Sequence, residues 1–191
     1  PTRRESIGGV EVVYLRSIAR YRAVTINPGV WPYCEEFLRD FDVVHLFGFY
    51  DLLGPAAALQ AAKGSRPYVI EPLGMTVPLL RSLSKKRLYH WLLGKRMLGS
   101  ASRIIATSEG EYKQLLDARL VARERLLLRR NGMELSEFFA APDRDSARQM
   151  LGPDDRRLVL FLGRLAPIKS VDLLIRAFAR LGLPGVRLVI A

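Results

Sequence analysis

The chain has 191 residues, of which 49% are hydrophobic and 26% charged, as in a soluble globular protein of one large domain or one and a half ordinary ones. The single cysteine excludes an internal disulfide, the two histidines disfavour a zinc site, and no apolar run reaches the roughly 18–20 residues that span a bilayer. The formal net charge of +11 predicts an anionic partner: nucleic acid, an anionic membrane surface or a phosphorylated substrate. From the low cysteine content and the polar first residues we expect a cytoplasmic location.

Short runs rich in branched residues alternate with amphipathic runs, which predicts an α/β fold with a doubly wound parallel sheet. The predicted strands are bounded by turn formers and cover residues 9–15, 21–26, 41–47, 66–71, 102–107, 124–130, 156–163 and 186–191. The predicted helices cover residues 31–39, 52–63, 79–98, 108–119, 146–151 and 171–181. Gly64 and Gly182 each follow a predicted helix, as glycine commonly does.

A charged, proline-containing stretch over residues 141–157 interrupts this rhythm and predicts a connection between two domains. We therefore expect a Rossmann-like domain over 1–142 that is incomplete at its start, a linker over 143–156, and the first β-α-β unit of a second Rossmann-like domain over 157–191. The chain ends in a strand-like run, and a buried parallel strand needs neighbours on both sides. We accordingly expect a fragment, or the ordered part, of a longer protein.

The segment 161–170, FLGRLAPIKS, connects a predicted strand to a predicted helix and carries two cations. Ligands of doubly wound sheets bind beyond the carboxyl ends of the strands, where Gly163 permits a tight turn and a helix N-terminus attracts anions. Arg164 can grip an anion with two parallel hydrogen bonds, and Lys169 adds a compact charge. The loop therefore predicts a diphosphate site, the alternative being two solvated charges. It matches neither a Walker A loop nor G-x-G-x-x-G, which disfavours a phosphate-loop NTPase and an ordinary dinucleotide site.

The segment FLGRLAPIKSVDLLIRAFARL resembles the G-R-L-x-x-x-K-G-x-D-x-L-I-x-A-F signature that opens the second domain of retaining glycosyltransferases of family 4. Three upstream segments resemble other motifs of that family, in the family's order. FDVVHLFGFYDLLGPAAALQAAKGSRPYVIEPLGM resembles its D-V-V-H-x-H-G strand, the next helix and its P-x-G-M turn; SRIIATSEGEYKQL resembles A-D-x-I-I-A-x-S-E-x-E; and RRNGMELSEF resembles I-P-N-G-V-D-x-x-x-F. The resemblance covers residues 42–191 and implies the GT-B fold, in which two Rossmann-like domains face each other across a cleft.

The resemblance implies that Gly163, Arg164 and Lys169 bind the diphosphate of a UDP-sugar or GDP-sugar donor, with no metal and no other cofactor. Positive charge at this place would also stabilise the departing nucleoside diphosphate. Asn131 and Gly132 match an N-G turn near the interdomain cleft, although N-G is also a common tight-turn dipeptide without further function.

The resemblance also implies cleft positions in the first domain. His45 stands at the end of the D-V-V-H run, Glu71 ends a predicted strand, and Gly74 belongs to the P-x-G turn. The alternatives are a packed, hydrogen-bonded His45 and a capping or solvated Glu71. Many relatives carry a histidine where this chain has Leu73, so the sugar must be held otherwise, and this substitution makes transfer of that role to His45 doubtful.

Two further positions are interpreted as helix caps. Ser108, followed by Glu109 and Glu111, predicts an N-cap with carboxylates at the positive end of the helix, in preference to a catalytic group. Ser170 replaces the usual glycine of the family signature, which is a mild change if the serine caps the next helix.

The segment from Leu79 to Leu98 predicts a basic amphipathic helix. Its apolar side carries Leu80, Leu83, Leu88, Trp91 and Leu92. No acidic residue occurs from position 72 to 108, whereas this stretch contains Arg81, Lys85, Lys86, Arg87, Lys95, Arg96 and Arg103. Such a helix can lie on anionic lipid headgroups, which predicts a peripheral position on the inner membrane face. The alternative is that the apolar side packs on the sheet. Nucleic-acid binding is disfavoured, because no known module and no interleaved aromatic platform is found.

The resemblance implies a glycosyltransferase of hexosyltransferase type that acts in polysaccharide biosynthesis and moves a sugar, with retention, to a hydroxyl of a glycan or lipid-linked acceptor. The alternatives are a nucleotide-sugar epimerase of the same fold and a non-catalytic binding or scaffold protein. The resemblance places the family's E-x7-E carboxylates beyond Ala191. The catalytic residues are therefore unknown, and we expect this chain to be inactive by itself.

Overall fold

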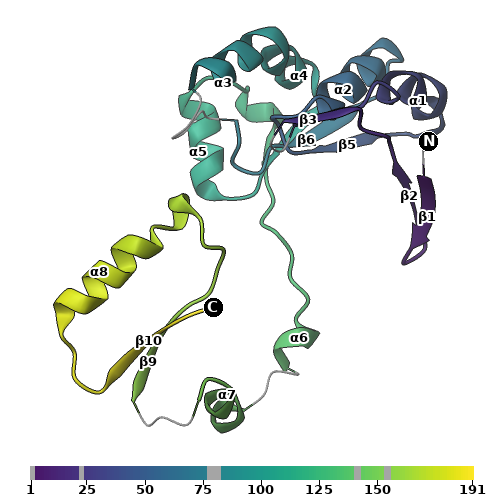
Figure 1. Cartoon of the computed structure of the whole chain (residues 1–191). Helices are drawn as coiled ribbons and strands as arrows, with labels where there is room; N and C mark the ends of the chain where they lie inside the picture. Colours follow the sequence, from purple (N-terminus) through teal and green to yellow (C-terminus); the bar gives the residue numbers. More distant parts are fainter. Residues whose placement is uncertain (1–2, 22–23, 77–82, 140–142, 153–155) are drawn as a thin grey trace. The chain divides into compact units, whose positions relative to one another are not determined.

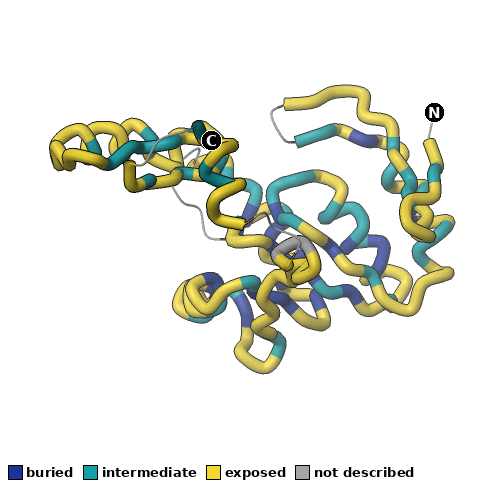
Figure 2. The backbone as a smooth tube through the Cα atoms, turned by 90° about the horizontal axis from the view of Figure 1, so that it is seen from below, coloured by how far each residue is buried: buried dark blue, intermediate teal, exposed yellow. Residues whose placement is uncertain are grey.

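The computed structural model describes residues 3–21, 24–76, 83–139, 143–152 and 156–191, apart from the side chains of residues 137 and 138. By compactness the chain divides into two units, Pro1–Gly132 and Met133–Ala191, hereafter units 1 and 2 (Figure 1). Buried residues, dark blue in Figure 2, all belong to unit 1 within the part of the chain that is described. No helix among the described residues is both long enough and apolar enough to cross a membrane.

A parallel sheet of four strands lies at the centre of unit 1, in the order β5-β6-β7-β8. These strands are β5 (Val44–Phe47), β6 (Tyr68–Glu71), β7 (Arg103–Ala106) and β8 (Leu126–Leu128). Their positions confirm the predicted strands over 41–47, 66–71, 102–107 and 124–130. Because the strands are parallel, their carboxyl ends meet at the same edge of the sheet.

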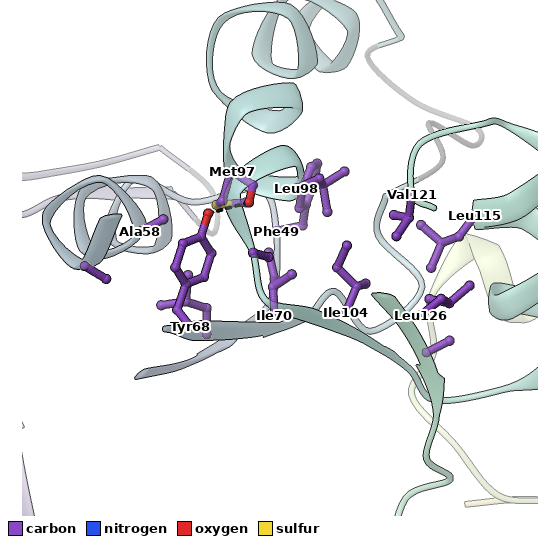
Figure 3. Packing of buried hydrophobic residues seen from close by; sticks show 14 residues of the cluster. Phe49, Ala58, Tyr68, Ile70, Met97, Leu98, Ile104, Leu115, Val121 and Leu126 are labelled. Atoms are coloured by element: carbon purple, nitrogen blue, oxygen red, sulfur yellow. Dashed lines mark hydrogen bonds between the residues drawn. The ribbon is translucent and has the colours of Figure 1, made fainter. Parts of the chain in front are cut away.

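Helices cover one face of this sheet and enclose the hydrophobic core of unit 1. Figure 3 shows side chains of β6 and β7, such as Ile70 and Ile104, facing Met97 and Leu98. The hydroxyl of Tyr68 donates to the carbonyl of Met97 at 2.6 Å, which satisfies the one polar atom of this otherwise apolar side chain. The elements around the core are α2 (Leu53–Lys63), α4 (Lys95–Ser100) and α5 (Glu109–Asp117). Burying each large apolar side chain contributes about 1.5–3 kcal/mol before the entropy cost of folding.

Successive side chains of a strand point to opposite faces of the sheet. Leu46 and Ile70 belong to the core cluster, so their neighbours His45, Phe47 and Glu71 lie on the other face. Phe47 is exposed there. The strand β5 extends two residues beyond His45, so His45 lies within the strand rather than at its end.

The predicted basic helix is observed from Leu83 and contains a π-helical turn. It consists of α3 (Leu83–Tyr89), the π-helix η2 (His90–Gly94) and α4. The predicted residues before position 83, Leu80 and Arg81 among them, lie outside the described residues. The expectation that its apolar side packs on the sheet is wrong: Leu88, Trp91 and Leu92 are exposed, and the buried side carries His90, Gly94, Met97 and Leu98.

Two antiparallel hairpins precede the parallel sheet. They are β1 (Arg3–Ile7) with β2 (Val10–Tyr14) and β3 (Ala19–Tyr21) with β4 (Val24–Ile26), followed by α1 (Val30–Phe37) and the short η1 (Leu38–Asp40). Gly8 and Gly9 connect β1 to β2 with φ of 58° and 81°, a conformation that glycine adopts without strain. These pairs are antiparallel, since a hairpin needs only such a local turn whereas a parallel pair needs a crossover.

Unit 2 contains a β-α-β unit, as predicted. Its strands β9 (Arg157–Phe161) and β10 (Val186–Ile190) are parallel, and α8 (Val171–Leu181) connects them. The remaining elements are α6 (Ser136–Phe139), α7 (Arg144–Met150), which lies within the predicted linker over 143–156, and the 3-10 helix η4 (Pro167–Lys169). Gly182 ends α8 in the left-handed conformation, with φ of 53°.

Candidate functional site

A buried carboxylate contacts an imidazole and a guanidinium near the carboxyl edge of the sheet in unit 1. Glu71, the last residue of β6, has a side chain that is only 2% exposed. Its Oε2 lies 3.2 Å from Nε2 of His45 on the neighbouring strand β5. The same oxygen accepts a hydrogen bond from the guanidinium of Arg129, the first residue after β8. We call His45, Glu71 and Arg129 the carboxyl-edge cluster.

The two partners of Glu71 in the carboxyl-edge cluster keep contact with solvent. The side chain of His45 is 32% exposed and that of Arg129 is 54% exposed. The imidazole of His45 also stacks on Phe47, with ring centroids 4.0 Å apart. Glu71 therefore orients an imidazole, whose other ring nitrogen can bond to a hydroxyl, and a guanidinium, whose remaining donors can reach a hydroxyl or an anionic group of a ligand.

The interpretation of Glu71 as a solvated or capping residue is wrong, because its carboxylate is buried and ion-paired. Arg129 was not identified as a site residue from the sequence. The signal that could have located it is its position directly after a strand, since parallel strands place such residues at one edge of the sheet.

Gly74 belongs to a tight turn that begins just after Glu71. Met75 N–H donates to the carbonyl of Pro72 at 3.0 Å, and the two central residues Leu73 and Gly74 have φ of 56° and 74°. Gly74 N–H donates to Oε1 of Glu111 at 2.6 Å. Glu111 thus fixes this turn against the start of α5.

Ser108 and Glu111 have the structural roles predicted for them. The Ser108 hydroxyl accepts from Glu111 N–H at 3.1 Å and caps α5. The Glu111 carboxylate is buried and also accepts from the amide and hydroxyl of Thr107, at 2.8 Å and 3.0 Å. The carboxylate therefore has no free face for catalysis and holds the turn and the helix together.

The backbone of Leu73, the residue before Gly74, is in the left-handed region. This conformation costs a leucine about 1–2 kcal/mol, and strain of this kind clusters at functional sites. The side chain is 44% exposed and so gains little from burial. The hydrogen bonds of the turn hold the leucine in this conformation.

In unit 2 the predicted donor residues lie on the connection between β9 and α8. Arg164 and Lys169 are both exposed, and neither has an ion-pair or hydrogen-bond partner for its side chain in the part of the chain that the structure describes. Lys169 ends η4 one residue before Ser170, the N-cap of α8. Both cations are therefore placed on the loop that leads into the helix N-terminus, where they are free to meet an anion.

The glycine and the serine of this loop differ from expectation. Gly163 has φ of 159°, close to extended, and its N–H donates to the carbonyl of Ala191 at 3.0 Å, so no tight turn occurs there. A Cβ at Gly163 would lie 3.4 Å from the ring of Phe161. Ser170 has φ of 51° and no side-chain cap hydrogen bond, so the prediction of serine capping is wrong. The left-handed backbone explains why glycine suits this position.

Asn131 and Gly132 are the last residues of unit 1, and both are exposed. They form no turn, and Gly132 is not among the glycines with positive φ. The interpretation of this pair as a tight turn is therefore wrong.

Two cavities in unit 1 lie away from the carboxyl-edge cluster. One of about 90 Å³ lies between α2 and α4, beside Leu92 and Arg96. The other, of about 260 Å³, lies between α1 and α2 near Cys34 and Gln60. Both are smaller than the roughly 300–1,000 Å³ of typical small-molecule sites. The cluster is consequently the better candidate for substrate contact in this unit.

The chain belongs to the glycosyl transferase 4-like domain family, whose model matches residues 1–132. Among curated proteins it is 38% identical over 98 residues to D-inositol 3-phosphate glycosyltransferase of Mycolicibacterium smegmatis, covering 51% of this chain and 22% of that protein. It is 34% identical over 88 residues to the protein of that name from Kineococcus radiotolerans, covering 46% of this chain and 20% of the relative.

Solved structures share the fold. Anabaena HepE in complex with UDP and glucose superimposes with a TM-score of 0.65 at 21% identity, covering 86% of this chain and 42% of HepE. Staphylococcus aureus MnaA with UDP gives a TM-score of 0.50 at 13% identity, covering 86% of this chain and 44% of MnaA. The chain thus has the Rossmann-like α/β architecture of GT-B glycosyltransferases and spans less than half the length of either protein.

Proposed function

We propose that this protein transfers a sugar from a nucleoside-diphosphate sugar to a hydroxyl of a glycan or lipid-linked acceptor, with retention of configuration. Membership of the glycosyltransferase family supports the reaction class. HepE, the structural neighbour with UDP-glucose bound, supports a nucleotide-sugar donor.

The observation that carries the proposal is a pair of exposed cations, Arg164 and Lys169, on the loop before α8, for which the described residues provide no side-chain partner. A guanidinium can bind two phosphate oxygens at once, and an ammonium adds a point charge. The N-terminus of α8, eleven residues long, contributes further positive potential. Together these groups would bind the donor diphosphate and stabilise the charge that develops when it leaves. Two cations can bind the diphosphate and neutralise its charge without a metal, so we propose that no metal takes part.

The carboxyl-edge cluster is our proposed contact for the acceptor. Glu71 orients His45 and Arg129, and both side chains keep contact with solvent. A sugar hydroxyl of the acceptor could bond to either side chain, and an anionic substituent could accept from Arg129. Gly74 follows at the same edge and leaves room, because a Cβ there would meet nothing within 4 Å.

The donor half of the proposal is tested by nucleotide binding to the 191-residue chain. UDP and GDP are titrated against it by calorimetry or by ³¹P NMR, and against Arg164→Ala and Lys169→Ala. Each variant should bind about 10- to 100-fold more weakly, because a hydrogen bond to a charged group contributes about 1.5–3 kcal/mol. Arg180→Ala is the matched control, since Arg180 is equally exposed but lies in the last turn of α8. Equal losses in all three variants would contradict a specific site.

The reaction class is tested on the protein extended to the length of its relatives. Labelled UDP-sugars and GDP-sugars are incubated with and without hydroxyl acceptors. Transfer to an acceptor supports the proposal, whereas isomerisation without an acceptor assigns the protein to the epimerases. If neither the 191-residue chain nor the extended protein binds a nucleotide, the protein is a non-catalytic scaffold. We propose a cytoplasmic enzyme of polysaccharide biosynthesis, held at the inner membrane face, and we expect no turnover by the 191-residue chain alone.

A further inference from the structure

One face of the α3–η2–α4 helix exposes large apolar side chains. Leu88, Trp91 and Leu92 are 55%, 69% and 54% exposed. With the exposed Lys95 they follow the i, i+3, i+4, i+7 spacing of a single helix face. This spacing ordinarily marks the buried side of a helix, but here it faces outward.

The helix already has a buried side that faces the core. His90, Gly94, Met97 and Leu98 are buried, and His90 Nε2 lies 2.5 Å from the carbonyl of Thr76. Gly94 packs against Phe49 so closely that a Cβ there would lie 2.9 Å from its ring. Because these residues pack on the core, the helix is held to unit 1 by a side other than its outward apolar face.

Basic side chains flank the exposed apolar face. Arg87, Lys95 and Arg96 are exposed, and none of them forms an ion pair with another described residue. The stretch from position 72 to 108 contains no Asp or Glu that could neutralise them. At the start of the helix, Lys85 lies over the ring of Tyr21, with Nζ 5.1 Å from the centroid, which extends the basic and aromatic surface to the β3–β4 hairpin.

We propose that this surface, made of Arg87, Leu88, Trp91, Leu92, Lys95 and Arg96 and here called the docking face, binds an anionic membrane. Trp91 and the leucines would enter the headgroup region while the cations contact lipid phosphates. This inference rests on the proposed function in one respect: docking would bring the enzyme to a lipid-linked acceptor. Membrane binding itself requires neither donor nor acceptor.

Charge complementarity favours a membrane over a second copy of the chain. In a symmetric dimer each residue of the face meets the same surface of the partner, so Arg87, Lys95 and Arg96 would approach like charges. An anionic lipid surface neutralises all three and accepts the apolar groups between them.

Trp91 provides a direct readout of docking. The chain has two tryptophans, so Trp31→Phe leaves Trp91 as the single reporter. This protein is mixed with vesicles of phosphatidylglycerol and phosphatidylcholine in equal amounts, or of phosphatidylcholine alone. We expect a blue shift of the emission and quenching by acyl-brominated lipid with the anionic vesicles only, both weakened by salt. Co-sedimentation with an unshifted, unquenched Trp91 would overturn the proposal.

Variants separate the docking face from general positive charge. Lys95→Ala with Arg96→Ala should weaken binding about 30-fold, from about fivefold for each basic residue removed near the surface. Leu88→Ser with Leu92→Ser should weaken it about tenfold or more. The matched control is Arg119→Ala with Arg123→Ala, which removes the same charge from exposed residues outside the helix. If the control variant loses as much vesicle affinity as Lys95→Ala with Arg96→Ala, binding is non-specific and the proposal fails.

The oligomeric state without lipid supplies the remaining outcome. A dimer in sedimentation velocity that Leu88→Ser with Leu92→Ser dissociates would assign the face to a second copy and overturn membrane docking. A monomer that binds anionic vesicles supports it. Because vesicle binding is measured without nucleotide, its failure is distinguishable from a failure of sugar transfer.

Discussion

In unit 1 the imidazole Nε2 of His45 lies 3.2 Å from the carboxylate Oε2 of Glu71, on the face of the sheet opposite to the hydrophobic core. The carboxylate is almost fully buried and also accepts from the guanidinium of Arg129. Three segments distant in the sequence therefore meet at one atom. This oxygen therefore orients both the imidazole of His45 and the guanidinium of Arg129 at the carboxyl edge of the sheet.

Replacing Glu71 by Gln should destabilise unit 1 by about 1–3 kcal/mol. The amide loses the negative charge that the guanidinium of Arg129 and the imidazole of His45 face. The effect should stay below the roughly 3–5 kcal/mol of a broken buried ion pair, because the half-exposed Arg129 can regain water. Urea unfolding monitored by circular dichroism measures the change.

Glu109→Gln is the matched control for Glu71→Gln. Glu109 pairs with Arg130, but both side chains are 73% exposed. Surface pairs contribute roughly 0–1 kcal/mol, so we expect a much smaller loss. Equal destabilisation in the two variants would mean that burial of Glu71 has no energetic role.

Gly94→Ala should destabilise unit 1 by about 1–3 kcal/mol through overpacking. The new methyl group would lie 2.9 Å from Phe49 Cζ and 3.1 Å from His90 Nδ1. Gly99→Ala, in the same helical segment, meets nothing within 4 Å and should stabilise by about 0.5 kcal/mol. Thermal unfolding of the two variants should therefore shift in opposite directions, and a shared direction would contradict the packing described for Gly94.

Tyr50→Phe should be neutral or slightly stabilising, whereas Tyr89→Phe should cost about 1–2 kcal/mol. The Tyr50 hydroxyl is buried with no hydrogen-bond partner among the described residues. The Tyr89 hydroxyl donates to the carbonyls of Phe49 and Asp51, at 2.5 Å and 3.0 Å. Urea unfolding at neutral pH distinguishes the two, and a larger loss for Tyr50→Phe would contradict these contacts.

Stability should also fall in alkaline solution. Burial raises the pKa of Tyr50 to about 12. Burial, reinforced by the negative charge of Asp51, also raises the pKa of Tyr89. A raised folded-state pKa gives stability that is complete below the unfolded pKa near 10 and is lost as pH rises through the folded value. The free energy of unfolding should decline between about pH 10 and 12, and less steeply in the double variant Tyr50→Phe with Tyr89→Phe. An unchanged slope in that variant would contradict the assignment.

Leu73→Asn should stabilise unit 1 by about 1 kcal/mol, because asparagine tolerates the left-handed backbone that leucine adopts under strain. The φ of Leu73 is 56°, and its 44% exposure means that the substitution loses little apolar burial. Leu88→Asn, at an exposed helical position, should instead destabilise slightly. If Leu73→Asn is the more damaging of the two, the leucine side chain has a role that its exposure does not reveal.

Much of the fold could be predicted from the sequence because the governing signals are local. Short runs rich in branched residues predicted β5 to β10, and Ser108 and Gly182 correctly marked the start of α5 and the end of α8. Arg164 and Lys169 follow a predicted strand, with four residues between them. Because the loop after a strand begins at the carboxyl end of that strand, the sequence also predicted where the two cations lie.

Other features depend on tertiary contacts that sequence patterns do not predict. Arg129 forms an ion pair with Glu71 because β6 and β8 run parallel in one sheet, which brings their carboxyl ends to the same edge. The helix at Leu88 and Trp91 turned its apolar stripe outward because Gly94 and His90 fit the space beside Phe49 better. Hydrophobic spacing determines that one face of a helix is apolar, but which face is buried depends on which side chains the core can hold without overlap, and only the tertiary structure decides that.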